Sequence, residues 1–101
     1  MTALATATIE GDTLALAGVL DFDSVLDVAE QGQHWLQESA PAQCNLDLSA
    51  ISYSSSAGIA LLLGWLRVAK KQQKTLHILR IPDDMVALAR VGGLEDLLSG
   101  A

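Results

Sequence analysis

The feature that most constrains this chain is a serine-rich junction between two apolar segments. Residues 46–51 have the composition of a β-strand, and residues 59–69 form an apolar run long enough for a helix. Four serines lie between them within five positions. We therefore predict a strand, a hydroxyl-rich turn and a long helix in direct succession, with Ser52, Ser54, Ser55 and Ser56 in the turn.

Ser56 stands where this helix is predicted to begin. A serine at such a place can cap the helix, because its side-chain oxygen accepts from an otherwise unpaired backbone N–H. The positive end of the helix dipole also favours negative charge there. Gly58 lets the backbone lie close to a neighbouring element within the first turn. Three roles stay open for Ser56: a cap, a contact with a partner, or a site of phosphorylation.

The central helix is predicted from Ser56 or Ala57 to about Lys71. Its core face is predicted to carry Ile59, Leu62, Leu63, Leu66 and Ala69. Three further apolar residues widen this face beyond what one sheet should cover, which leaves self-association through the helix open. They are Leu61, Trp65 and Val68.

The opposite line of the same helix begins with a hydroxyl, continues with two very small residues and ends with two cations. A glycine in a helix interior costs about 1 kcal/mol relative to alanine, which favours close packing against another backbone over mere tolerance at the surface. The basic residues at the helix end either complement its dipole or form a docking patch. The stripe comprises Ser56, Ala60, Gly64, Arg67 and Lys71.

Hydrophobic periodicity predicts the remaining elements. Alternation over 6–10 and 13–17 indicates a hairpin around Gly11-Asp12. Ser24 and Asp27 have capping-box spacing at the start of a helix that runs to about Ser39. Strands are predicted over 43–48 and 75–79, and a last helix opens at Pro82. The side chains of the last helix that we predict to face inward are Met85, Leu88, Ala89 and Val91, and Leu94, Leu97 and Leu98 add an apolar turn in the tail.

The resulting order is β-β-α-β-α-β-α in a single domain, residues 1–101. The β-α-β-α-β part implies parallel pairing, and the hairpin adds an antiparallel strand. We expect an α/β fold with a mixed sheet of four or five strands and helices packed on it.

Composition excludes several function classes. A net charge of −6 argues against nucleic acid or anionic lipid as the main partner. The sequence has no phosphate-binding loop, metal-ligand cluster or nucleophile elbow, so we expect no cofactor, no metal and no enzyme. Cys44 is the only cysteine and is predicted to be buried. We also expect no signal peptide or membrane span, which fits a cytoplasmic protein.

At the central junction the sequence resembles the STAS domain family, which includes the anti-sigma-factor antagonists. The family pattern is Asp-Leu-Ser, then Asp-Ser-Ser-Gly-Leu with a switch serine at the helix start. Asp47-Leu48-Ser49 matches the first part. In the second part, positions 55–58 correspond to Asp, the switch Ser, Ser and Gly, and here hold Ser55, Ser56, Ala57 and Gly58.

The segment Gly18-Val19-Leu20-Asp21 resembles the family's Gly-Glu-Leu-Asp, and the resemblance implies that Asp21 lies close to the switch hydroxyl. Likeness is greatest to the family's transporter subunits. It implies a cytoplasmic subunit that contacts the ATPase of a phospholipid-transporting ABC complex through the Ser56 position. It further implies support of that complex, with its permease, and hence of outer-membrane lipid asymmetry.

The alternative is an anti-sigma-factor antagonist that is switched by phosphorylation of Ser56. Two departures bear on it, because Ser55 stands where the family has Asp and Ala57 removes the second serine. A phosphate on Ser56 would add about two negative charges to a surface suited to close approach. We expect it to break such a contact.

Overall fold

The structure is a computed structural model and describes residues 5–93. Its seven elements follow the predicted order. The strands are β1 (Ala5–Glu10), β2 (Thr13–Leu20), β3 (Gln43–Ser54) and β4 (Thr75–Leu79); the helices are α1 (Val25–Glu38), α2 (Ser56–Lys71) and α3 (Asp83–Val91). The predicted residues Leu94, Leu97 and Leu98 lie outside the described part of the chain.

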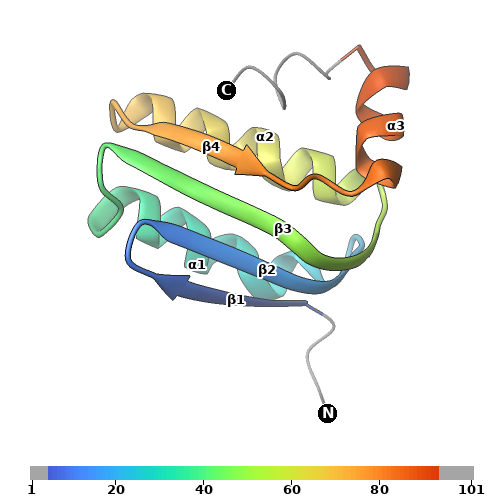
Figure 1. Cartoon of the computed structure of the whole chain (residues 1–101), viewed down its shortest axis with the longest axis horizontal. Coiled ribbons are helices and arrows are strands. Elements are labelled where there is room, and N and C mark those ends of the chain that lie inside the picture. Colours follow the sequence, from blue (N-terminus) through green and yellow to red (C-terminus); the bar gives the residue numbers. More distant parts are fainter. Residues whose placement is uncertain (1–4, 94–101) are drawn as a thin grey trace.

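The four strands form one mixed sheet in the order β1-β2-β3-β4 (Figure 1). The β1–β2 pair is antiparallel around a two-residue turn in which Gly11 has a positive φ of 58°. The β2–β3 and β3–β4 pairs are parallel. The predicted mixed α/β topology is therefore confirmed, with four strands.

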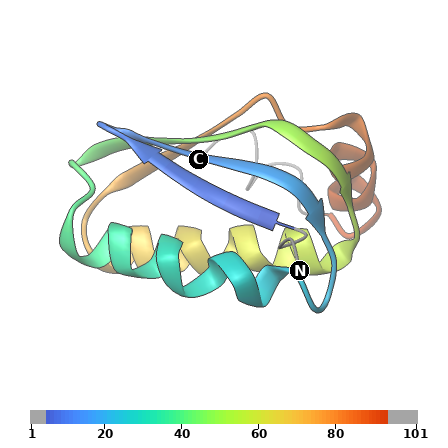
Figure 2. The ribbon, with the colours of Figure 1, turned by 90° about the horizontal axis from the view of Figure 1, so that it is seen from below.

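Both long helices pack on the same face of the sheet, whereas α3 lies at the end of the sheet (Figure 2). The core lies between that face and the two helices. Its most completely buried side chains include Leu14, Leu16 and Leu20 from β2, Cys44, Leu46 and Leu48 from β3, Val28 and Leu36 from α1, and Leu62 from α2.

The apolar excess of α2 is covered by α1. Leu61 and Trp65 are buried, and the Trp65 indole N–H donates to the carbonyl of Ala29 at 3.1 Å. A Cβ at Gly32 of α1 would collide with the Trp65 ring, so this glycine makes the close helix contact possible. The apolar surface around Leu61 and Trp65, which left self-association open, is therefore buried inside the protein.

Strand β3 is longer than predicted. It continues past Leu48 to Ser54, so that Ser52 and Ser54 belong to the strand and the turn shrinks to Ser55. The pairing with β2 shifts register twice, between Ala15 and Ala17 and between Gly18 and Val19. These irregularities interrupt the alternation of buried and exposed residues that marks a regular strand, and they explain the wrong boundary. Strand β2 is also longer than predicted, because it ends at Leu20 and not at residue 17.

Two glycines provide a matched test of this packing. Gly32→Ala should lower the free energy of unfolding by about 1–3 kcal/mol, since the added methyl meets a buried indole. Gly64→Ala should instead leave it unchanged or raise it by up to about 1 kcal/mol, because a Cβ there meets nothing within 4 Å. Urea denaturation of both variants measures the difference, and equal effects would contradict the helix contact.

Candidate functional site

The amino-terminal end of α2 is held against the carboxyl ends of two parallel strands. The Ser55 N–H donates to the carbonyl of Leu20, the last residue of β2, at 2.8 Å. A Cβ at Gly58 would lie 3.3 Å from the Cβ and Cδ1 atoms of Leu20 and would collide with the Ser54 hydroxyl. The close approach predicted for Gly58 is therefore present, and the absence of a side chain permits it.

Ser54, Ser55 and Ser56 have three different environments at the start of α2. Ser55 is the cap, with extended backbone and a hydroxyl oxygen that accepts from the Ala57 N–H at 3.2 Å. Ser54 is buried and its hydroxyl donates to the Ser55 carbonyl at 2.9 Å. Ser56 is the first helical residue, is exposed, and has no hydrogen-bond partner for its hydroxyl among residues 5–93. Ser56 is therefore not the cap of α2, and contact with a partner and phosphorylation remain as its two predicted roles.

Asp21 serves the start of α1. Its carboxylate accepts from the Ser24 N–H at 2.8 Å and from the Asp23 N–H at 3.0 Å, and these bonds lower the pKa of Asp21. The Ser24 hydroxyl is buried and donates to the Val19 carbonyl at 2.6 Å. The predicted capping box of Ser24 and Asp27 is therefore wrong. The Leu20–Ser55 bond brings the backbone of Asp21 near the α2 cap, although its carboxylate makes no hydrogen bond to Ser56.

The small-residue stripe of α2 faces away from the protein. Ser56, Ala60, Arg67 and Lys71 are exposed and Gly64 is half-buried. A Cβ at Gly64 would meet no atom of residues 5–93 within 4 Å. If close packing is the reason for this glycine, the packing element must come from outside the described residues.

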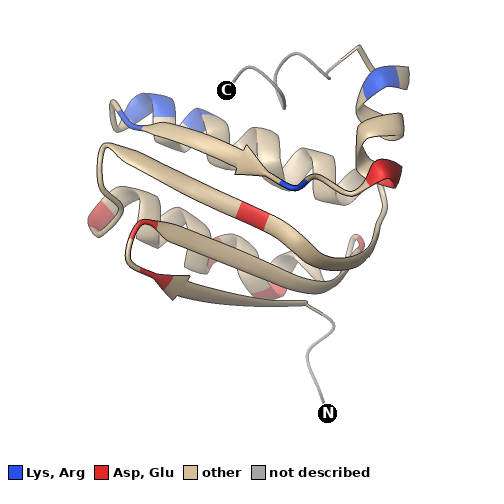
Figure 3. Cartoon of the chain, in the orientation of Figure 1, with Lys and Arg blue, Asp and Glu red and all other residues tan. Residues whose placement is uncertain are grey.

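The basic residues of α2 lie in its second half, away from its amino-terminal end, whereas Arg80 follows β4 and Arg90 belongs to α3 (Figure 3). Lys70 and Lys71 occupy the last turn, where they complement the negative end of the helix dipole. Lys74 is hydrogen-bonded within the protein, because its ammonium group donates to the Leu36 carbonyl at 2.6 Å.

A groove between the β3–α2 junction and α3 was missed by sequence reasoning. It has a volume of about 470 Å³ and is lined by Tyr53, Ser54, Ser55, Ser56, Asp84, Ala87, Leu88 and Val91. Leu88 and Val91 were predicted to face inward, yet 39% and 89% of their surfaces are exposed, and Tyr53 is 52% exposed. Met85 and Ala89 are fully buried as predicted.

Helix geometry could have placed Val91 correctly. It lies about 200° around the helix from Ala89, on the far side from the core. The position of Tyr53 had no comparable signal, since it depends on the register shifts of β3.

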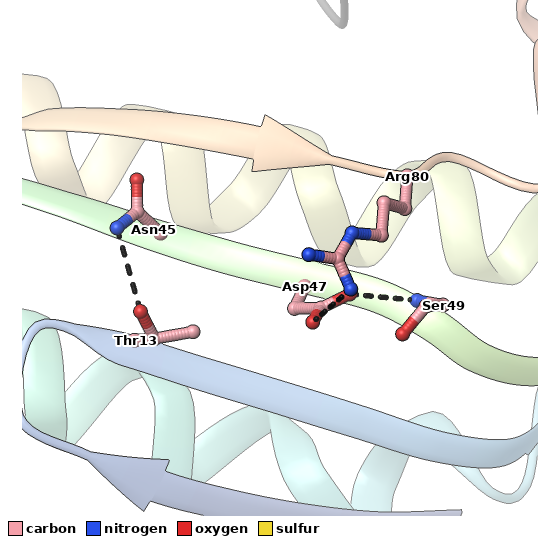
Figure 4. Close-up of polar contacts among 5 residues, drawn as sticks. All are labelled: Thr13, Asn45, Asp47, Ser49 and Arg80. Atoms are coloured by element: carbon pink, nitrogen blue, oxygen red, sulfur yellow. Dashed lines mark hydrogen bonds and ion pairs between the residues drawn. The ribbon is translucent and has the colours of Figure 1, made fainter.

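The Asp-Leu-Ser segment has a structural role on the open face of the sheet (Figure 4). The Asp47 carboxylate accepts from the Ser49 N–H at 2.9 Å, at the first register shift of β3. An ion pair with Arg80 at 3.6 Å adds to it, but the arginine is 69% exposed, so this contribution is small. These contacts, chiefly the bond from Ser49, lower the pKa of Asp47. On the same face Asn45 donates to Thr13 at 3.4 Å.

Within residues 5–93 no group of three or more potential ligands could hold a metal ion. Cys44 is buried, and that burial raises the pKa of its thiol, which disfavours the reactive thiolate. His77 lies on the open sheet face beside Gln43, at 2.9 Å between ring nitrogen and amide oxygen. None of the described helices is long and apolar enough to cross a membrane.

Comparison with known proteins identifies relatives over nearly the whole chain. The sequence pattern of the family described as "Mlab, STAS domain" matches residues 4–99. The intermembrane phospholipid transport system binding protein MlaB of Escherichia coli K12 is 36% identical over 84 residues, which cover 83% of this chain and 82% of the relative. MlaB of Shigella flexneri matches with the same identity and coverage.

Solved structures share the fold. A chain of the Acinetobacter MlaFEDB complex superposes with a TM-score of 0.76 at 21% identity, covering 93% of this chain and 98% of that one. The unphosphorylated anti-sigma factor antagonist SpoIIAA superposes with a TM-score of 0.71 at 17% identity, covering 90% of this chain and 82% of that one.

Asp47 provides a pH-dependent test of the β3 geometry. Its folded-state pKa is lowered, so its stabilisation is fully present above the ordinary aspartate pKa of about 3.9 and is lost as the pH falls through the lowered value. Asp47→Asn should therefore destabilise the protein by about 1 kcal/mol at neutral pH. The difference from the wild type should stay constant down to about pH 4 and shrink as the pH falls further. Urea denaturation at pH values from neutral to well below the ordinary aspartate pKa measures this, with Asp27→Asn on α1 as the control.

Proposed function

The chain belongs to the STAS domain family, and on that premise we propose that it is a non-catalytic subunit of a phospholipid-transporting ABC complex. Its partner in this proposal is an MlaF-like ATPase subunit, bound within a complex that also contains the permease. The protein supports the assembly and activity of the complex and thereby outer-membrane lipid asymmetry. It resides in the cytoplasm, at the inner membrane through its partner. The identity to MlaB over 83% of the chain supports this assignment.

The observation that carries the proposal is the open α2 face. Ser56, Ala60 and Gly64 form a strip of small residues, of which Ser56 and Ala60 are exposed and Gly64 is half-buried, and no atom of residues 5–93 fills the space above Gly64. Small residues at a spacing of four allow the backbone of a second protein to approach closely. The exposed Ser56 hydroxyl, free of any hydrogen bond to the described residues, lies at the start of that strip.

The residues around Ser56 fit docking better than catalysis. A nucleophilic serine needs a base within hydrogen-bond reach, and the residues that line the groove beside Ser56 include no histidine or lysine. The one carboxylate among the described residues that line the groove belongs to Asp84 on α3.

The second candidate, a phosphorylation-controlled anti-sigma-factor antagonist, draws on the exposed Ser56 and on the fold shared with SpoIIAA. The local charge disfavours it. A phosphate on Ser56 would share the groove with the Asp84 carboxylate, and no arginine or lysine lines that groove to compensate.

A bulky residue on the α2 face should separate folding from binding. Ala60→Trp and Gly64→Trp should each weaken binding to the ATPase–permease complex by tenfold or more, which is about 1.4 kcal/mol. Both should leave the thermal unfolding temperature close to that of the wild type, because the positions are open. Gln37→Trp, on the exposed side of α1, is the matched control. Undiminished binding by both α2 variants would refute the interface.

Ser56→Glu should also abolish binding, because its longer side chain would occupy the space at the start of the strip where the partner approaches, whereas Ser56→Ala should retain most of it. Affinity purification from native cell membranes with tagged wild type and both variants gives the readout. An ABC ATPase and its permease should accompany the wild type and Ser56→Ala only. Recovery of a serine kinase in their place would instead support the anti-sigma-factor antagonist.

A further inference from the structure

The groove beside Ser56 has a lining of two chemical kinds. Its apolar part comprises Tyr53, Ala87, Leu88 and Val91. Its polar part includes Ser55 and Ser56 at the start of α2 and Asp84 on α3. Tyr53, Leu88 and Val91 are exposed around this one groove. An exposed apolar patch of this kind is typical of a surface that binds a second molecule.

Among the described residues that line the groove, Asp84 is the only charged one, and its carboxylate has no ion-pair partner among residues 5–93. Asp84 lies in the first turn of α3, where its charge complements the positive end of that helix's dipole, and Asp83 precedes it outside the groove. Arg90 lies in the last turn of the same helix and is not among the residues that line the groove. The cations of α2 lie at its other end (Figure 3).

These features select the chemistry of an occupant. A phosphate or carboxylate would face an unpaired like charge, with no cation among the described residues that line the groove. A purely apolar segment would leave Asp84 and the hydroxyl groups partly desolvated and unpaired. A basic side chain suits both kinds of lining residue, because its methylene stem packs on apolar residues while its charged head donates to oxygen atoms. The half-exposed ring of Tyr53 can also stack against a guanidinium group.

We propose that this groove receives a basic side chain, flanked by apolar residues, from the ATPase partner. The inference rests on the proposed function and deepens it, because it adds a second contact beside the α2 strip and states the chemistry of the partner there. Continuity supports it, since Ser56 belongs both to the groove and to the strip.

Two adjacent aspartates allow a sharp test. Asp83 and Asp84 are both exposed in the first turn of α3, yet only Asp84 lines the groove. Asp83→Lys and Asp84→Lys change the net charge and the helix terminus equally. The binding of each variant to the purified ATPase–permease complex is measured at several salt concentrations. We expect Asp84→Lys to weaken binding by tenfold or more at low salt, and Asp83→Lys to change it by less than about threefold.

The outcomes separate the two proposals. No binding by the wild type would refute the proposed function itself. Wild-type binding with equal effects of the two lysine variants would overturn only the groove, because general charge would then explain the loss. Tighter binding by Asp84→Lys would also overturn it and would indicate an anionic occupant. Asp84→Asn should lose much of the affinity and flatten its salt dependence if a cation is bound.

A second pair of variants tests the apolar part of the groove's lining. Val91 and Leu26 are 89% and 75% exposed, so neither contributes much to the core. Val91→Ser should weaken binding severalfold, whereas Leu26→Ser on α1 should not. A photo-crosslinking residue at position 91 then identifies the bound segment of the ATPase. A segment that contains arginine or lysine supports the proposal, and one without either overturns it.

Discussion

The close approach of Gly58 to β2 and β3 is the contact on which the arrangement of this protein's surface depends. A side chain at this position would collide with Ser54 and crowd Leu20. Together with the bond from Ser55 to the Leu20 carbonyl, it holds α2 at one height and one rotation relative to the sheet. That rotation turns Leu62 into the core and Ser56 outward. The exposed strip is therefore a consequence of how the buried side of the same helix is packed.

Local pattern was sufficient for most of the fold. The element order, the hairpin turn at Gly11 and the bounds of α2 follow from periodicity and turn residues within short windows. The end of β3 did not follow, because the burial pattern there is set by register shifts against β2 and by the Asp47–Ser49 bond. The cover over Trp65 was likewise a matter of tertiary packing, although Gly32 on the apolar side of α1 was a readable signal.

The groove illustrates a stronger limit. Its walls come from the last residues of β3 and from a helix about thirty positions later in the chain. No short-range pattern relates Tyr53 to Leu88 and Val91, and an amphipathic interpretation of α3 assigned those two residues to the core. Ser56 could be predicted because one segment contains the strand end, the cap and the helix start. The groove beside it arises only when α3 docks at the end of the sheet.

The serine at position 55 changes the charge at the start of α2 without removing the cap. Its neutral hydroxyl accepts from the Ala57 N–H, whereas the aspartate of the family pattern would add a negative charge at the helix end. In this chain the one carboxylate among the described residues of the groove belongs to the first turn of α3, and it has no ion-pair partner within residues 5–93. Negative charge at a cap stabilises the protein that carries it. Negative charge across a groove, unpaired and beside apolar residues, is instead available to a second molecule, which is why we infer a binding role for Asp84.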